Sequence, residues 1–144
     1  MIRAGANVEK KDPNFKRAPL LFAVEKAHME VIASLILAGA SVETTDRDGW
    51  TPLLSATYWG NSRVVEMLLA SGADINRPSP DGKNWTAVLT ATWVGKDEVL
   101  DVLLRHGANL EIANNEGWTP LAVSIDKGMK ETASKLVCAG AALS

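Results

Sequence analysis

The chain has 144 residues, a formal net charge of −2 and 47% hydrophobic residues. This length and composition can build one continuous core but not two domains of ordinary size. The near-neutral charge argues against a nucleic-acid partner, because nucleic-acid-binding modules usually carry a strongly basic face. The longest apolar stretch, Val31–Ala40, has about half the length of a membrane span. We therefore expect a buried helix there and no membrane insertion.

A short phrase that begins with Gly-Ala returns five times along the chain. It starts at Gly5, Gly39, Gly72, Gly107 and Gly140, so the intervals are 34, 33, 35 and 33 residues. A fixed period of this length is the signature of a stacked repeat protein. Since solenoids mostly present long surfaces to other molecules, the period favours binding over catalysis.

In chain order, we expect a stub of a preceding repeat at residues 1–11 and four repeats at about 12–44, 45–77, 78–112 and 113–144. Together they would form a single domain. Extra residues fall only in the loops, before Pro19 and before Ala87, as expected for segments that tolerate insertions. Met1 and Ile2 stand where a preceding repeat would carry its last apolar pair. We therefore expect the chain to be an excerpt of a longer polypeptide.

Each repeat is predicted to contain two helices. Thr51, Thr86 and Thr119 can cap the first helices, and proline at the next position suits a first helical turn. Gly60 can end such a helix in a left-handed conformation. In the second helices, an apolar stripe such as Val64, Val65, Leu68 and Leu69 predicts a buried face. The lone Cys138 is expected to fill space in a final helical turn.

The segments Thr51-Pro52-Leu53-Leu54-Ser55-Ala56 and Thr119-Pro120-Leu121-Ala122 resemble the Thr-Pro-Leu-His-x-Ala signature of the ankyrin repeat. Residues 63–73 resemble the second half of that motif. The resemblance covers essentially the whole chain and implies an all-α repeat solenoid, in which paired antiparallel helices alternate with β-hairpin-like loops. The family's histidine is replaced throughout, by Leu21, Leu54, Leu89 and Ala122. We therefore expect weaker polar bonding between repeats and more apolar contact.

Ankyrin-repeat proteins usually bind partners in a concave groove lined by the loops and the first helices. Aromatic side chains are concentrated at these positions. The resemblance thus makes eight residues candidates for protein binding: Phe15, Arg17, Trp50, Tyr58, Trp59, Trp85, Trp93 and Trp118. The tryptophans directly before the Thr-Pro position could instead pack between repeats. Tyr58, Trp59 and Trp93 have no such structural role, and they carry the binding hypothesis.

The sequence is interpreted as a non-catalytic protein–protein interaction module, with a structural spacer or intramolecular scaffold as the alternative. His28 and His106 are 78 residues apart with no nucleophile near either one, and no metal or cofactor motif occurs. Lys16 and Arg17 would suit a peptide that is acidic at one end and apolar in its middle.

We expect a monomer that self-associates weakly through its aromatic patch. The single cysteine and the absence of a signal peptide at Met1 favour a cytoplasmic location, and the nucleus is also compatible.

Overall fold

The computed structural model describes residues 8–14 and 17–141. Within these residues the regular structure is entirely helical, as predicted. The helices are α1 (Pro19–Glu25), α2 (Met29–Leu37), α3 (Pro52–Trp59), α4 (Ser62–Ala70), α5 (Ala87–Val94), α6 (Asp97–Arg105), α7 (Pro120–Asp126) and α8 (Lys130–Cys138). Among them, no helix has both the length and the apolar character that would let it cross a membrane.

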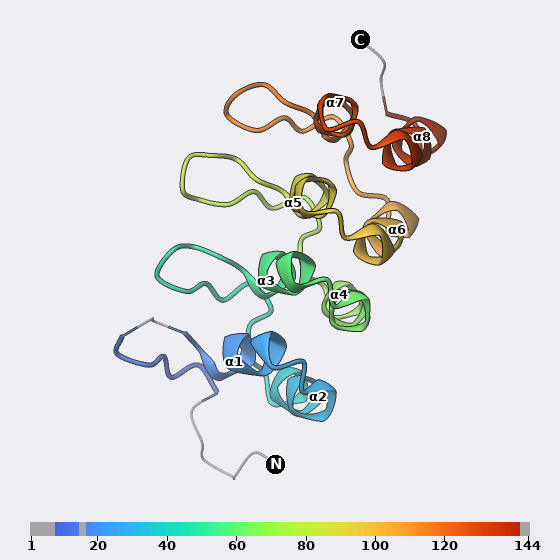
Figure 1. Ribbon diagram of the computed structural model, residues 1–144. Coiled ribbons are helices and arrows are strands. Elements are labelled where there is room, and N and C mark those ends of the chain that lie inside the picture. The colour runs from blue at the N-terminus through green and yellow to red at the C-terminus, as the bar shows by residue number, and fades with distance from the viewer. Residues whose placement is uncertain (1–7, 15–16, 142–144) are drawn as a thin grey trace.

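The helices form two columns that run from the N-terminal to the C-terminal end of the molecule (Figure 1). The first helices α1, α3, α5 and α7 contact one another in that order, and each also packs against its own second helix. The loops project from the column of first helices, on the side away from the second helices. Each loop folds back on itself through a backbone hydrogen bond, for example from Asp46 N to Trp50 O at 3.2 Å. These are the hairpin-like loops that the resemblance implies.

One hydrophobic core runs through the helix pairs. Its fully buried members include Leu20, Ile32, Leu68, Leu103 and Leu136. The leucines in place of the family's histidine belong to this interior, since Leu54 is 1% exposed and Leu89 is fully buried. Apolar contact therefore does replace the histidine, as expected.

Two sequence predictions about the second helices are wrong. The Val31–Ala40 stretch is not buried throughout: Ile32 and Leu35 are in the core, but Leu37 is 88% exposed. Cys138 is also exposed and does not fill an interior space. The reason is the same in both cases. A residue two positions beyond a core residue is rotated by about 200° around the helix, so it points away from the neighbouring helix.

The predicted helix ends are confirmed. Thr51, Thr86 and Thr119 each accept a hydrogen bond at their Oγ1 from the backbone N–H three residues later, at 3.2–3.3 Å. Gly60 ends α3 with a φ of 76°. The first repeat has Ala27 at the same place, and it adopts a φ of 56°. An alanine in this left-handed region is less favourable than glycine.

Polar bonds between repeats are present, but at a different place from the missing histidine. The last residue of the Gly-Ala phrase reaches forward with its side chain to the backbone of the next loop. Glu9 Oε1 accepts from Ser41 N at 2.6 Å, Glu43 Oε1 from Asp74 N at 2.8 Å, and Asn76 Oδ1 from Asn109 N at 2.8 Å. These three bonds form a polar ladder that joins successive repeats.

Candidate functional site

The residue two positions before each first helix is held by its loop. Its backbone N–H donates to a side-chain oxygen at the start of the same loop, at distances of 2.7–3.1 Å. The four donor–acceptor pairs are Arg17 with Asp12, Trp50 with Asp46, Trp85 with Ser79, and Trp118 with Asn114. Each loop therefore fixes the backbone from which a candidate binding residue projects.

The third loop is longer and uses a hydroxyl group in place of a carboxylate or amide. Ser79 Oγ accepts from Trp85 N and donates to Asp81 Oδ1 at 2.7 Å. The Asp81 carboxylate also accepts from Lys83 N at 3.0 Å. The Ser79 hydroxyl, followed by the Lys83 N–H, lowers the pKa of Asp81, because both stabilise the ionised form. The insertion is thus an ordered turn that ends at Trp85.

Three of these loop residues, Arg17, Trp50 and Trp85, contact the residue eight positions later, which lies in the last turn of the first helix of the same repeat. Trp50 and Tyr58 pack edge to face, with their ring centroids 5.8 Å apart. Trp85 and Trp93 do the same at 5.7 Å. In the first repeat the equivalent pair is ionic, because Arg17 Nη1 bonds to Glu25 Oε2. The molecule therefore carries matched pairs along one side, ionic in the first repeat and aromatic in the next two.

The aromatic side chains divide into two groups by exposure. Trp50, Trp85 and Trp118 are half-buried, which fits the packing role considered for them. Tyr58, Trp59 and Trp93 are 46%, 60% and 51% exposed. For large aromatic rings this corresponds to roughly 300 Å² of accessible surface in total. Exposed apolar surface of this extent, rimmed by polar residues, often marks an interaction site.

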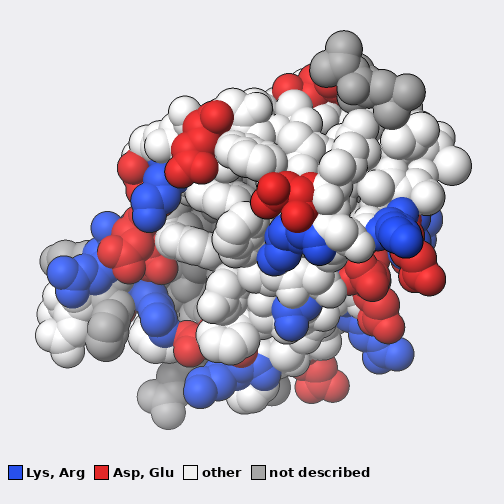
Figure 2. Space-filling model, turned by 45° about the horizontal axis from the view of Figure 1, so that its top comes forward, with Lys and Arg blue, Asp and Glu red and all other residues white. Residues whose placement is uncertain are grey.

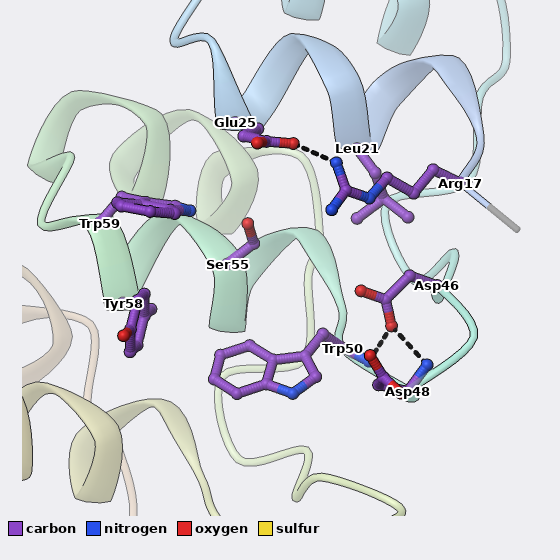
Figure 3. Close-up of a pocket in the computed structure, with 9 residues that line it drawn as sticks. All are labelled: Arg17, Leu21, Glu25, Asp46, Asp48, Trp50, Ser55, Tyr58 and Trp59. Carbon is purple, nitrogen blue, oxygen red and sulfur yellow. Dashed lines mark hydrogen bonds and ion pairs between the residues drawn. The ribbon is translucent and has the colours of Figure 1, made fainter. Parts of the chain in front are cut away.

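Two grooves open between repeats along this aromatic side. The first groove has a volume of about 330 Å³ and lies between the first and second repeats. The first repeat contributes Arg17 and Glu25 to its lining, and the second repeat contributes Trp50, Tyr58 and Trp59 together with Asp46 and Asp48. Figure 3 shows the rings of Trp50, Tyr58 and Trp59 on one side of this groove and the side chains of Asp46 and Asp48 on the other.

The second groove, of about 400 Å³, lies between the third and fourth repeats. Its lining includes Trp85, Trp93, Trp118, Glu116 and Asp126. Seven of the eight candidate residues thus line these two grooves, and Phe15 lies outside the described residues. Whether the seven bind a partner stays a prediction.

Two residues at the grooves, Lys127 and Glu25, were missed from the sequence. Lys127 Nζ lies 4.4 Å from the ring centroid of Trp93 and donates to Trp93 O at 2.6 Å. In addition, Glu25, Asp46 and Asp48 make the first groove acidic. Alignment of the repeats could have found Lys127, because it precedes Gly128 as Trp59 precedes Gly60. The ion pair of Arg17 with Glu25 was not noticed in the sequence, and it neutralises one of the two basic residues on which the expected acidic peptide would depend; the other, Lys16, lies outside the described residues.

The charges elsewhere are mixed. On the face shown in Figure 2, basic and acidic side chains are interspersed and do not merge into a broad field of one sign. His106 Nε2 lies 3.1 Å from Glu66 Oε1, in a surface pair at the end of α6. Among the described residues, no three His, Cys, Asp or Glu side chains are placed to hold a metal ion.

The sequence and the fold were compared with those of known proteins. A family profile for ankyrin repeats in three copies matches residues 1–79 and, again, residues 77–144. The crystal structure of an ankyrin repeat domain from Acinetobacter baumannii superposes with a TM-score of 0.88 and 33% identity, over 96% of this chain and 72% of that one.

Curated relatives include two longer proteins. Human mitochondrial disaggregase is 42% identical over 46% of this chain, and palmitoyltransferase AKR1 of the yeast Lachancea kluyveri is 38% identical over 51%. The matched segments span only 9% and 10% of those two proteins. The likeness to them therefore concerns the repeats. With its full length covered by the profile and its fold matched by a solved relative, this chain belongs to the ankyrin-repeat family.

Proposed function

We propose that this chain is a protein–protein interaction module that binds a partner across a concave aromatic face. We define this aromatic face as Trp50, Tyr58, Trp59, Trp85, Trp93 and Trp118. Ankyrin repeats are generally protein-interaction modules and typically non-catalytic. The observation that carries the proposal is the exposure of Tyr58, Trp59 and Trp93, which leaves three large rings about half open to water.

The fold does not require aromatic residues at these three places. The same positions in other repeats hold Glu25, Lys26, Asp126 and Lys127, so the helix forms equally well with charged side chains there. Exposed rings favour partner binding because aromatic side chains add large contact areas and are enriched among residues that dominate binding energy. A role in binding accounts for the choice of residue where packing does not.

The proposal is tested by affinity capture with the wild-type chain and the Trp59→Ala/Trp93→Ala variant. We expect a partner that the wild type retains and the double variant loses, since truncating a central tryptophan typically costs about 2 kcal/mol or more in binding. The control is Leu37→Ala, which removes an even more exposed apolar side chain from the column of second helices and should leave capture unchanged. Circular dichroism verifies that all three proteins fold.

The outcomes separate the roles. Equal capture by the wild type and the double variant would place the binding surface elsewhere on the molecule. If neither protein captures a partner, the result would favour the alternative role as a spacer or intramolecular scaffold.

We also infer that the chain acts as a monomer in a reducing compartment such as the cytoplasm. Cys138 is exposed and is the only cysteine, so it cannot form a disulfide within the chain. Sedimentation of the reduced protein should give the monomer mass of 15.4 kDa. A stable dimer under reducing conditions would contradict the inference.

A further inference from the structure

We propose that the first groove receives an arginine or lysine side chain of the partner, and that an apolar residue of the same extended segment covers the Trp85–Trp93 pair. This inference rests on the proposed function and specifies the chemistry of its ligand. It reverses the charge expected from the sequence, which suggested an acidic peptide on account of Lys16 and Arg17.

The first argument is the charge of the first groove. Among the described residues that line it, the three carboxylates of Glu25, Asp46 and Asp48 stand against the single guanidinium of Arg17, so their charges sum to −2. Arg17 is already bonded to Glu25, and its guanidinium carbon also lies 5.5 Å from the ring centroid of Phe22. The guanidinium of Arg17 is therefore already engaged by side chains of the first repeat. The carboxylates of Asp46 and Asp48 keep the groove acidic.

The second argument is the bonding of the two remaining carboxylates. Asp46 Oδ1 accepts the backbone N–H groups of Asp48 and Trp50 at 2.9 and 3.0 Å. Its Oδ2 and the whole Asp48 carboxylate have no side-chain partner among the described residues. In Figure 3 the second oxygen of Asp46 lies below the side chain of Arg17 and points toward the side of the groove where Ser55 and Trp59 lie. Acceptors that face a groove without a donor are suited to an incoming cationic group.

The third argument is the aromatic wall opposite these carboxylates. Trp59 is 60% exposed and packs edge to face with Tyr58, with their centroids 5.3 Å apart. A cation over an aromatic face gains most when it is partly desolvated and when the ring is tryptophan. The chain already contains one such contact, because Lys127 Nζ lies over Trp93 at 4.4 Å. No basic side chain is found over Trp59 among the described residues. A side chain from the partner can take the equivalent place.

The spacing of the two sites sets the form of the ligand. Packed helices are separated by about 8–10 Å, so the Trp85–Trp93 pair lies roughly 14 Å from the middle of the first groove. An extended chain advances about 3.3 Å per residue. The basic and apolar residues of the ligand should therefore be about four positions apart. Such a segment also avoids Lys127, which would repel a second cation at Trp93.

The test uses three synthetic peptides of nine residues with blocked ends. Each has leucine at position seven and threonine at all remaining positions except position three, which is arginine, glutamine or glutamate. Binding to the complete chain is measured by titration calorimetry and tryptophan fluorescence. We expect the arginine peptide to bind about tenfold more tightly than the glutamine peptide, because it adds charge-assisted hydrogen bonds and a cation–π contact. The glutamate peptide should bind more weakly still, and added salt should reduce the preference for arginine.

Variants assign the effect to the first groove. Asp48→Lys should remove the preference for arginine, and Glu30→Lys is the matched control because it makes the same charge change on the outer helix α2. Equal affinity for the three peptides, with all binding lost in Trp59→Ala, would overturn the cationic ligand and leave the aromatic face intact as a binding site. Failure of all three peptides to bind at millimolar concentration would also overturn this inference, and capture of a partner would then decide the proposed function separately.

Discussion

Removing the Glu43 side chain should measure how much the polar ladder between repeats contributes to stability. Glu43 Oε1 accepts the N–H of Asp74 at 2.8 Å, and Glu43 Oε2 pairs with Arg77 Nη1 at 2.8 Å. Both side chains of this ion pair are about one-third exposed, at 30% and 37%, so solvent screens their attraction. The Glu43→Ala substitution leaves the Asp74 N–H without its acceptor, and it leaves the Arg77 guanidinium only its bond to the backbone O of residue 43, at 3.2 Å.

The magnitude follows from the two lost contacts. A hydrogen bond to a charged acceptor contributes about 1.5 kcal/mol or somewhat more, and a partly exposed ion pair adds about 0.5 kcal/mol. We therefore expect a loss of about 2 kcal/mol in the free energy of unfolding. With an unfolding entropy of about 2.1 cal/mol/K per residue, this lowers Tm by about 6–7 °C for a chain of this length.

The assay is thermal unfolding followed by circular dichroism at 222 nm, with Glu43→Gln and Glu116→Ala as comparisons. Glu43→Gln keeps the acceptor for Asp74 and loses only the charge, so Tm should fall by about 2–3 °C. Glu116 is an exposed loop residue with no side-chain partner among the described residues, and its removal should leave Tm unchanged. If Glu43→Ala matches Glu116→Ala, or if Glu43→Gln is as damaging as Glu43→Ala, the reasoning about the ladder is refuted.

Three further substitutions test the core, the helix ends and the aromatic face. Leu68→Ala removes a fully buried side chain and should lower the free energy of unfolding by about 2–5 kcal/mol in urea titrations; a loss below 1 kcal/mol would contradict its place in the core. Ala27→Gly should raise stability by up to about 1 kcal/mol and Gly60→Ala should lower it, because both positions have positive φ. Shifts of the same sign would show that the left-handed conformation is not what matters. Trp59→Ala should change the Tm by no more than about 3 °C, since its ring is 60% exposed; a large drop would mean that the ring serves packing.

The sequence by itself determined the features that are local in the chain. The repeat period, the eight helices of the described residues, their threonine caps and the turn at Gly60 all depend on residues within a few positions of one another. The concentration of aromatic residues on the loops and first helices was also visible, because repeats of nearly constant length bring equivalent positions into register. The identity of the candidate site therefore came from the sequence.

Only the tertiary structure decided the features that join different repeats or different faces. The contact of Lys127 with Trp93 and the bond between Asp74 and Glu43 connect residues 34 and 31 positions apart. No pattern within one stretch of the sequence predicts such contacts. The exposure of Leu37 and Cys138 depends on which side of each helix meets its neighbour, which apolar composition alone does not specify. The pairing of Arg17 with Glu25 also joins a loop and a helix, and it is one of the observations behind the proposal of a basic ligand, because the charge that a groove offers depends on which of its side chains are already bonded to each other.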